Sequence, residues 1–167
     1  GSFPGASLWR ANLLQAIVQD VDLSGADLTE ANFHAVNLSG SNFAGATMIR
    51  TSLTKTNMIG VNLSGADLTG ANLSEAKLHD ADMRGANMHK ADLPTADMTG
   101  ANLRGASFED ANLTWSTMVN ADLRGVNFSK ANLGSADLSG ADLSGANLTG
   151  ARFCKTKMPT GMDNSDC

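Results

Sequence analysis

Histidines, cysteines, carboxylates and arginines are the side chains of this sequence that are best suited to chemistry. The three histidines, His34, His79 and His89, share one position of a five-residue repeat but differ in their place within a twenty-residue coil. That spacing places them on three different corners of a coil, so they cannot converge on one metal ion. We therefore predict that all three are solvated surface histidines.

Carboxylates and thiols lack the neighbours that catalysis or metal binding needs. Most aspartates sit one residue before the central apolar residue of a repeat, an outward position that favours turn hydrogen bonds and solubility over a calcium site. Cys154 has no histidine nearby to activate it. No phosphate loop or dinucleotide fingerprint is present. The sequence predicts no catalytic residue, no cofactor and no metal ligand.

Arginines and one tryptophan are the candidate contacts for a partner. Arg84, Arg104 and Arg124 are spaced by twenty residues and predict a vertical ladder beside a column of glycines, with Asp82 two residues before the first. Asp122 has the same relation to the third. The ladder is either a locally compensated surface or a site for an acidic partner or anion.

Trp115 projects from a corner whose equivalent positions in the adjacent coils hold Thr95 and Ser135. An exposed tryptophan can anchor a protein partner, although a single one is weak evidence. We keep Trp115 beside the three arginines as a possible partner contact.

A strict five-residue period positions all of these side chains. Every fifth residue from Phe3 to Met158 is Leu, Met, Phe or Val, and the residue two before it is small. In extended backbone those two positions face the same side, and Ser, Thr and Gly then form a corner. A five-residue period would carry an apolar stripe around a helix by about 140° per repeat. The pattern therefore predicts an all-β solenoid.

Residues spaced by twenty show how many corners make one coil. One corner column is glycine throughout: Gly5, Gly25, Gly45, Gly65, Gly85, Gly105, Gly125 and Gly145. Another, from Gln15 to Lys155, contains no glycine. Four five-residue faces per coil explain this separation, and about eight coils give a rod of about 38 Å at about 4.8 Å per coil. Four large and four small side chains should fill the square and leave no channel or ligand cavity.

Two finer expectations follow for the corners. The glycine corner should have positive φ at the glycine, as in a type II turn, and corners that carry Lys, Glu or Trp should differ from it. Opposite charges recur in another column, which begins Arg10, Glu30, Arg50 and later holds Lys90 and Asp110. Stacking should bring them to cross-strand pairing distance.

Length and charge limit the class of protein. The 167 residues are almost fully used by one solenoid, and the net charge of −5 argues against a nucleic-acid surface. No apolar run approaches the about 20 residues that span a bilayer. We expect residues 1–2 to be a cloning scar, residues 3–158 to form one β-helix and residues 159–167 to form a capping tail.

The units at 66–70 (ADLTG), 71–75 (ANLSE) and 141–145 (ADLSG) resemble the A(D/N)LXX signature of the pentapeptide-repeat family. The resemblance covers about residues 6–153. It implies a right-handed quadrilateral β-helix, in a family abundant in cyanobacteria and chloroplast lumens, and it implies no single activity. Some members resemble duplex DNA and bind gyrase.

The two ends depart from the repeat. Trp9, Leu14 and Ile17 occupy positions that are polar in most later units. Either the first coil stays in register, with an end that is covered or makes an end-to-end contact, or residues 7–21 form a short helix, which their apolar spacing also suits. At the other end the repeat stops at Pro159, which cannot donate to another strand.

Cys154 and Cys167 are the only cysteines. A disulfide between them would close a loop of about 14 residues and contribute about 3 kcal/mol, and the close of the repeat, residues 153–159, is similar to the ends of cyanobacterial and lumenal family members. We favour this bond over two free thiols. It would indicate an oxidising compartment, a periplasm or thylakoid lumen, with the cytoplasm as the alternative.

The leading functional interpretation is a non-enzymatic structural or protein-interaction solenoid that binds an unidentified protein. We expect no nucleic-acid partner and no membrane insertion, and either a monomer or an end-to-end dimer. The alternative is a DNA-mimicking protein that binds gyrase, which would need continuous acidic faces. The charges of this chain alternate in one column and are basic in another.

Overall fold

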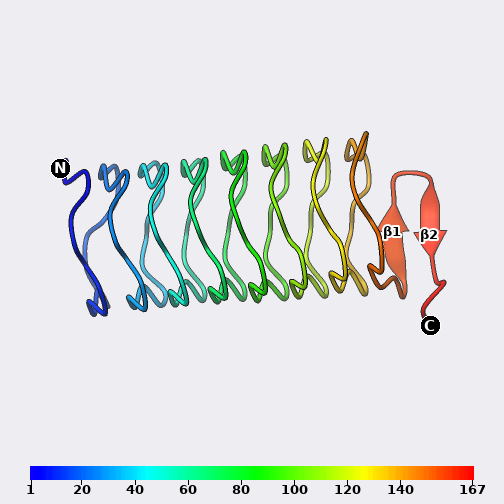
Figure 1. Cartoon of the computed structure of the whole chain (residues 1–167), viewed down its shortest axis with the longest axis horizontal. Coiled ribbons are helices and arrows are strands. Elements are labelled where there is room, and N and C mark those ends of the chain that lie inside the picture. The colour runs from blue at the N-terminus through cyan, green and yellow to red at the C-terminus, as the bar shows by residue number, and fades with distance from the viewer.

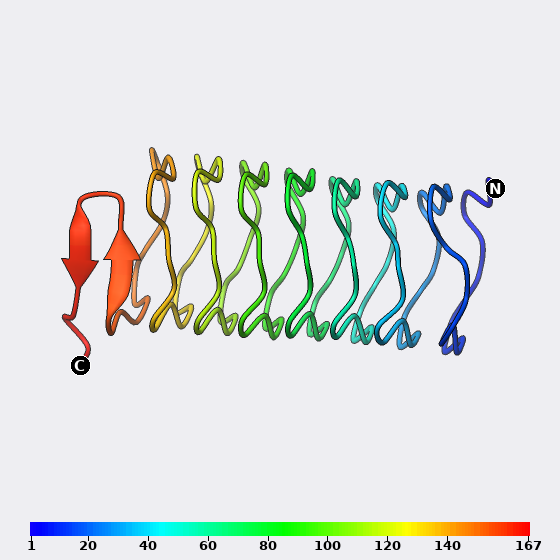
Figure 2. The same cartoon turned by 180° about the vertical axis from the view of Figure 1, so that it is seen from behind.

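The chain forms a rod of stacked coils, with its two termini at opposite ends (Figure 1). The computed structural model describes residues 1–167. Parallel bridges join residues that are twenty apart, from Ser2 with Asp22 to Asp137 with Lys157. Each coil therefore has four five-residue faces, which confirms the square cross-section. The view from behind shows the same regular stack (Figure 2).

Main-chain hydrogen bonds hold consecutive coils together. The central residue of a face donates its N–H to the coil above, as Leu68 does to the Asn87 oxygen at 2.7 Å. Asn87 donates back to the Ala66 oxygen at 2.9 Å. Because the repeat never changes length, this pair of bonds recurs through the body of the rod and fixes the register of each face.

Central and small residues face inward, as predicted, and form one core. Leu68 and Leu73 have no exposed surface. The phenyl rings of Phe33 and Phe43 meet edge to face at 6.3 Å, and those of Phe108 and Phe128 stack at 5.4 Å. Hydroxyls at small inward positions donate to main-chain oxygens, so no buried side-chain polar atom lacks a partner. The buried hydroxyl residues are Ser41, Thr51, Thr56, Ser116 and Thr156.

The outward Asp or Asn of each unit shapes the following corner. In the unit at 66–70, the Asp67 carboxylate accepts the Thr69 N–H at 3.0 Å and the Thr69 hydroxyl at 2.6 Å. The amide oxygen of Asn72 does the same for Ser74. These contacts are Asx turns, which confirms the turn-forming role predicted for the outward acidic residues.

The corners share one backbone shape, so the prediction that non-glycine corners differ is wrong. Gly65 has a φ of 65°, and Lys55 and Trp115 have φ values of 58° and 61°. Each corner must turn the chain through the same angle and donate its N–H to the next coil, as Lys55 does to Ser74 and Trp115 to Gly134, both at 2.9 Å. The stacking therefore imposes left-handed backbone on side chains that disfavour it.

The charged column forms only in its first half. Glu30 accepts hydrogen bonds from Arg10 at 2.6 Å and Arg50 at 2.7 Å, and these arginines lower its pKa. The expected pairing of Lys90 with Asp110 does not occur. Lys130, the next cation of this column, instead lies 4.0 Å from the carboxylate of Glu109, the residue before Asp110.

The C-terminal end is closed over part of its area. Strand β1, Thr156–Met158, pairs antiparallel with strand β2, Gly161–Asp163. The carboxylate of Asp166 accepts the Phe153 N–H at 2.6 Å. The main-chain N–H of Asp166 donates to the Phe153 oxygen at 2.8 Å. The tail is tied down by a disulfide between Cys154 and Cys167.

The first coil stays in register on three of its four faces, so the helical alternative for residues 7–21 is wrong. Ser7 bridges to Asp27 and Asn12 to Asn32. On the fourth face, Ile17 forms no bridge to Asn37. The ladder bonds that would join Ala16 and Val18 to Asn37 are missing, although the Asp20 N–H still donates to the Ser39 oxygen at 3.2 Å. No helix in the structure has the length and apolar character needed to cross a bilayer.

Candidate functional site

The arginine ladder lies at one corner of three consecutive coils. Each arginine precedes a glycine in left-handed conformation, and nothing lies within 4 Å of where a Cβ would be at Gly85, Gly105 or Gly125. The adjacent column is therefore bare. Side chains of Arg84 and Arg124 are 57% and 47% exposed, so their guanidinium groups reach solvent on this open corner.

The first and third arginines are held by carboxylates on their own coils. Arg84 donates Nε to Asp82 Oδ1 at 2.8 Å and Nη2 to Oδ2 at 2.6 Å. Arg124 makes the same two bonds with Asp122, at 2.8 and 2.5 Å. Hydrogen bonds from Arg124 lower the pKa of Asp122 to about 2, and those from Arg84 lower the pKa of Asp82. Both pairs are bidentate.

Arg104, between them, has no such partner. The residue two before it is Asn102, whose amide oxygen accepts only the Arg104 main-chain N–H, at 3.3 Å. No carboxylate forms an ion pair with Arg104, although its charge helps to lower the pKa of Asp122. The ladder thus contains one uncompensated guanidinium between two compensated ones. The sequence carried this signal, because Asn102 stands where the neighbouring coils have aspartate.

Trp115 is exposed at a different corner, with 67% of its surface accessible. Below it, a shallow polar groove is lined by side chains that the sequence analysis did not group together. Two of them are in contact, because His79 Nε2 lies 3.0 Å from Asp97 Oδ2. The lining residues are Glu75, Ala76, Lys77, His79, Thr95 and Asp97. The structure does not bring Trp115 and the arginine ladder together, because they lie on different corners.

The remaining histidines make local contacts. His34 Nδ1 lies 2.5 Å from the Thr54 hydroxyl on the next coil, on a corner different from that of His79. His89 lies on a third corner, and its main-chain N–H donates to the Asn87 amide oxygen at 3.2 Å. No group of three or more His, Cys, Asp or Glu side chains is placed to hold a metal ion.

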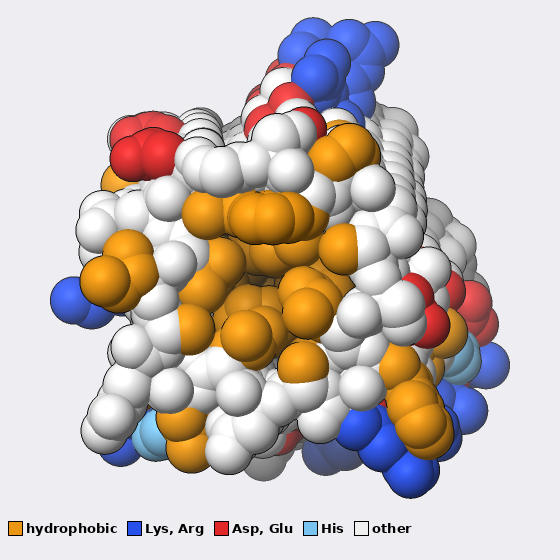
Figure 3. Space-filling model, turned by 90° about the vertical axis from the view of Figure 1, so that its left-hand side faces the viewer, with side chains coloured by type: hydrophobic (Ala, Val, Ile, Leu, Met, Phe, Trp, Pro, Cys, Tyr) orange, Lys and Arg blue, Asp and Glu red, His pale blue; other side chains and the backbone are white.

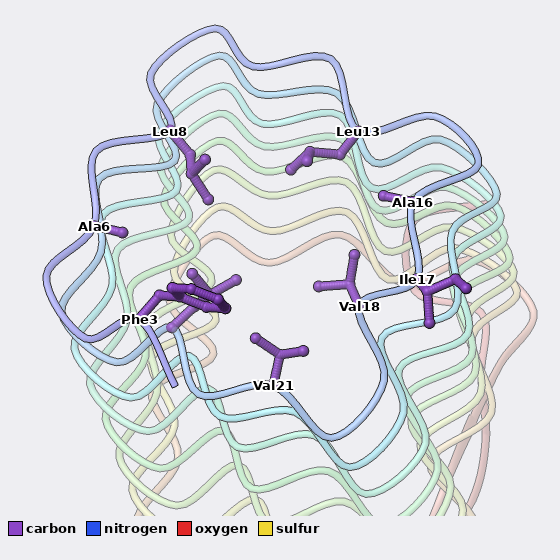
Figure 4. A pocket seen from close by; sticks show the side chains of 9 residues that line it. Phe3, Ala6, Leu8, Leu13, Ala16, Ile17, Val18 and Val21 are labelled. Carbon is purple, nitrogen blue, oxygen red and sulfur yellow. The ribbon is translucent and has the colours of Figure 1, made fainter. Parts of the chain in front are cut away.

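The N-terminal end opens into an apolar cavity of about 280 Å³, whereas the sequence predicted a filled square. Figure 3 shows apolar side chains gathered in the hollow centre of this end. In Figure 4, Phe3, Leu8 and Leu13 point into the opening, as does Val18 from the displaced fourth face. The lining residues all belong to the first coil and the start of the second, so the opening lies at the end of the stack.

Parallel four-sided coils of five-residue faces define a right-handed quadrilateral β-helix, a solenoid that presents flat surfaces. The chain belongs to the pentapeptide repeat family. The family model for pentapeptide repeats matches in eight copies, over residues 2–29, 31–70, 62–100, 106–145 and 121–158. Proteins of this family are generally non-enzymatic structural or interaction proteins. No curated protein matches the chain.

Several solved structures are similar to this chain. HetL, a pentapeptide repeat protein involved in heterocyst differentiation in the cyanobacterium Nostoc, is 29% identical over 96% of this chain and 88% of its own, with a TM-score of 0.41. QnrB1, a plasmid-mediated fluoroquinolone resistance protein, is 17% identical over 90% of this chain and 88% of its own, with a TM-score of 0.56.

A third similar structure is a pentapeptide repeat protein from the thylakoid lumen of Arabidopsis thaliana. It is 31% identical over 56% of this chain and 67% of its own, with a TM-score of 0.42. The similarity to QnrB1 supports the shared fold and carries no information on function, because the identity is low. These comparisons place the chain in its family and leave its biological role open.

Proposed function

We propose that this protein is a non-enzymatic interaction solenoid that binds an acidic segment of a partner protein through the arginine ladder. The observation that carries this proposal is the unpaired guanidinium of Arg104 between two saturated arginine–carboxylate pairs. A carboxylate of the partner can accept two parallel hydrogen bonds from Arg104, which is the geometry that arginine favours.

The neighbouring pairs define the selectivity of this contact. Asp82 and Asp122 already occupy Arg84 and Arg124, so a partner with one acidic side chain at the centre of its contact fits better than a continuous polyanion. Like charges stacked at coil spacing would otherwise repel, and the two internal carboxylates remove most of that repulsion. The rigid coils fix the backbone of all three arginines, and Asp82 and Asp122 hold the guanidinium groups of the outer two, which lowers the entropic cost of binding.

Affinity capture from an extract of the source cells tests the proposal. We expect Arg104→Ser to lose a partner that the unaltered protein retains, with binding weakened by about tenfold or more. Arg84→Ser is the matched control, because it removes an arginine that already has an internal carboxylate. Equal capture by the unaltered protein and the Arg104→Ser variant contradicts the ladder as the binding site and directs attention to Trp115.

The second candidate is a gyrase-binding mimic of DNA. Its support is that some members of the family resemble duplex DNA and bind gyrase. Its weakness is the mixture of charges on these faces, where Arg84, Arg104 and Arg124 interrupt the outward aspartates. Inhibition of gyrase supercoiling by the purified protein would support this candidate. We expect no inhibition, because a DNA mimic needs continuous negative charge.

We further propose an extracytoplasmic location, in a periplasm or thylakoid lumen. The supporting feature is the disulfide between Cys154 and Cys167, since such bonds persist in oxidising compartments. Fractionation of the source cells tests this, and recovery of the protein only as a reduced cytoplasmic form would contradict it.

A further inference from the structure

We propose that the acidic segment bound by Arg104 crosses the second face of the rod and places a second carboxylate on Lys90. This inference rests on the proposed function and deepens it, because it states which way the segment runs and how its acidic residues are spaced. The second face follows the glycine column, and its outward residues in the three coils of the ladder are Asn87, Ser107 and Asn127.

Carboxylates close the other side of the arginine ladder to an acidic segment. The first face, which precedes the glycine column, carries Asp82 and Asp122 in the first and third coils of the ladder. Asp142 follows in the next coil, 3.8 Å from Arg124. An acidic segment on this face would meet like charges, which repel it. The segment therefore approaches Arg104 over the second face.

The second face is uncharged at its centre over these three coils. The glycine column between this face and the arginines is bare, as nothing lies within 4 Å of where a Cβ would be at Gly105. The amide and hydroxyl side chains of Asn87, Ser107 and Asn127 can exchange hydrogen bonds with the main chain of an extended segment. One coil earlier this face becomes acidic at Asp67, to which Asn87 donates at 3.2 Å. The ladder coils therefore offer the segment a neutral path of limited height.

Charges along the far edge of the second face select one direction across it. In the coil of Arg104 that edge carries Glu109 and Asp110, which repel an acidic segment running straight across. In the following coil, Lys130 lies 4.0 Å from Glu109. In the preceding coil, Lys90 is exposed and, unlike Lys130, forms no ion pair. The segment therefore runs diagonally, from Arg104 to Lys90.

Lys90 has no partner because of what the preceding coil presents to it. Lys130, in the same column, reaches back one coil to Glu109. The equivalent residue for Lys90 is Thr69, and the corner residue beside it is Gly70. Neither residue carries a charge, so the ammonium group of Lys90 is available to a carboxylate from outside the chain.

The diagonal sets the spacing of the two acidic residues. Opposite faces of the square lie about 10 Å apart and consecutive coils about 4.8 Å apart, so the two cationic positions are separated by about 11 Å. In an extended segment, residues four positions apart point to the same side and are separated by about 13 Å, whereas residues two apart are separated by only about 7 Å. Long lysine and arginine side chains can take up the remaining difference of about 2 Å. We therefore expect two acidic residues with three residues between them.

NMR titration with two synthetic peptides tests the proposal. Both peptides are flexible Gly-Ser chains with two glutamates, which are four positions apart in one peptide and adjacent in the other, so their charges are equal. At low salt, we expect the spaced peptide to bind with a Kd of about 1–10 mM and to shift the amide resonances of Arg104, Ser107 and Lys90. The Nε–H resonances of Arg84 and Arg124 should not move, because aspartates already hold these groups.

The Lys90→Ser variant distinguishes a direct contact from a long-range effect of charge. It should weaken binding of the spaced peptide by about threefold to fivefold and leave binding of the adjacent peptide nearly unchanged. Ser135 already has a positive φ of 59° at a corner, so serine is compatible with this backbone. Lys77→Ser removes an exposed lysine of the fourth face and is the matched control for net charge. It should weaken neither peptide.

Equal weakening of both peptides by Lys90→Ser overturns the diagonal path, as does no weakening of the spaced peptide. Resonance shifts on the first face instead of the second also overturn it, and so does a lack of binding by the spaced peptide at about 10 mM. The Arg104→Ser variant separates this failure from failure of the proposed function. If Arg104→Ser weakens both peptides and Lys90→Ser weakens neither, the ladder contact stands and only the path is wrong. If Arg104→Ser changes nothing, both proposals fail.

Discussion

At the scale of single residues, many corners hold a non-glycine residue in left-handed backbone, which such residues disfavour. Left-handed backbone costs an L-residue roughly 1–2 kcal/mol relative to the right-handed region. Ala35 has a φ of 56°, and other corners hold residues as large as Trp115. Glycine at every corner would remove this strain but would also leave the faces without the side chains that a partner can recognise.

Replacing a corner residue by glycine should therefore stabilise the rod. We expect Ala35→Gly to raise the free energy of unfolding by about 0.5–1 kcal/mol, since the strain relieved exceeds the entropy that glycine adds to the unfolded chain. Gly65→Ala should lower it by about 1 kcal/mol for the backbone reason alone, because nothing lies within 4 Å of the new Cβ. Urea unfolding measures both changes.

Ala44 provides the control for that experiment. It precedes Gly45 in the same kind of corner but does not have positive φ. Ala44→Gly should thus destabilise the protein slightly, through chain entropy only. If glycine stabilised positions 35 and 44 equally, left-handed strain would not be the cause.

The pKa of Asp122 predicts a pH-dependent contribution to stability. Hydrogen bonds from Arg124 lower this pKa from 3.8 to about 2. A carboxylate whose pKa is lower in the folded chain stabilises the fold fully above its ordinary pKa, and that contribution is lost as the pH falls from 3.8 through about 2. NMR titration of the carboxyl carbon should give a midpoint near 2.

Arg124→Gln should return that midpoint toward the ordinary value. Arg84→Gln should leave the Asp122 midpoint unchanged, because Arg84 bonds to Asp82, which lies two coils away from Asp122. A midpoint for Asp122 that is unchanged in the Arg124→Gln variant would contradict the bidentate pair as the cause of the lowered pKa.

At the scale of elements, the C-terminal tail supplies side-chain acceptors in place of the main-chain oxygens of a further coil. Side chains of Asp166 and Asn164 accept main-chain N–H groups that a further coil would otherwise take, at 2.6 and 2.9 Å. Strand β2 then runs antiparallel to β1 and ends the parallel stacking. The disulfide keeps these contacts together, although the tail is short and exposed.

Reduction of the disulfide should release this tail. The bond closes a loop of about 14 residues, worth about 3 kcal/mol in the chain-entropy account. We expect a reducing agent, or Cys154→Ser with Cys167→Ser, to accelerate trypsin cleavage after Lys155 and Lys157 by more than about tenfold. Mass spectrometry of the fragments measures this.

Lys55 is a suitable internal reference for that digestion, because it lies in the same corner column as Lys155 but in the body of the rod. Its cleavage should stay slow in both redox states. Equal acceleration at Lys55 and Lys155 would indicate global unfolding rather than local release of the tail.

Much of this architecture could be predicted from the sequence, because a strict period of five residues excludes a helix and requires a short extended face followed by a corner. The glycine column that includes Gly65 and Gly85 indicated four corners per coil, and the structure has them. The ends were less predictable. Neither the open face at Ile17 nor the ladder contacts of Asp166 follow from periodicity. Both occur in end coils, which have a neighbouring coil on one side only.

The candidate site shows the same limit. Spacing placed Arg84, Arg104 and Arg124 on one corner, with Asp82 and Asp122 beside the first and third, but it did not single out Arg104. The difference between them depends on whether the carboxylate two residues earlier reaches the guanidinium, a short-range contact within one coil. Asn102 was visible in the sequence, and its effect on Arg104 became clear only from that geometry.

At the scale of the whole molecule, stability should vary along the rod. Each coil contacts only its neighbours, so an inner coil is held on two sides and an end coil on one. Hydrogen exchange should be slowest near Leu68 and Leu73, faster toward both ends, and fastest on the fourth face of the first coil. Uniform protection from end to end would contradict this gradient.

Because strand β2 ends the parallel stacking, the number of internal coils can change without altering the structure of either end. Because bridges join residues twenty apart throughout the body, duplicating any internal block of twenty residues would add one coil of about 4.8 Å and leave both ends intact. Insertion or deletion of five residues would instead rotate all later side chains by a quarter turn and divide every column. A duplication of twenty residues in the gene thus lengthens the rod and keeps every side-chain column. A duplication of five residues moves the later side chains to other faces.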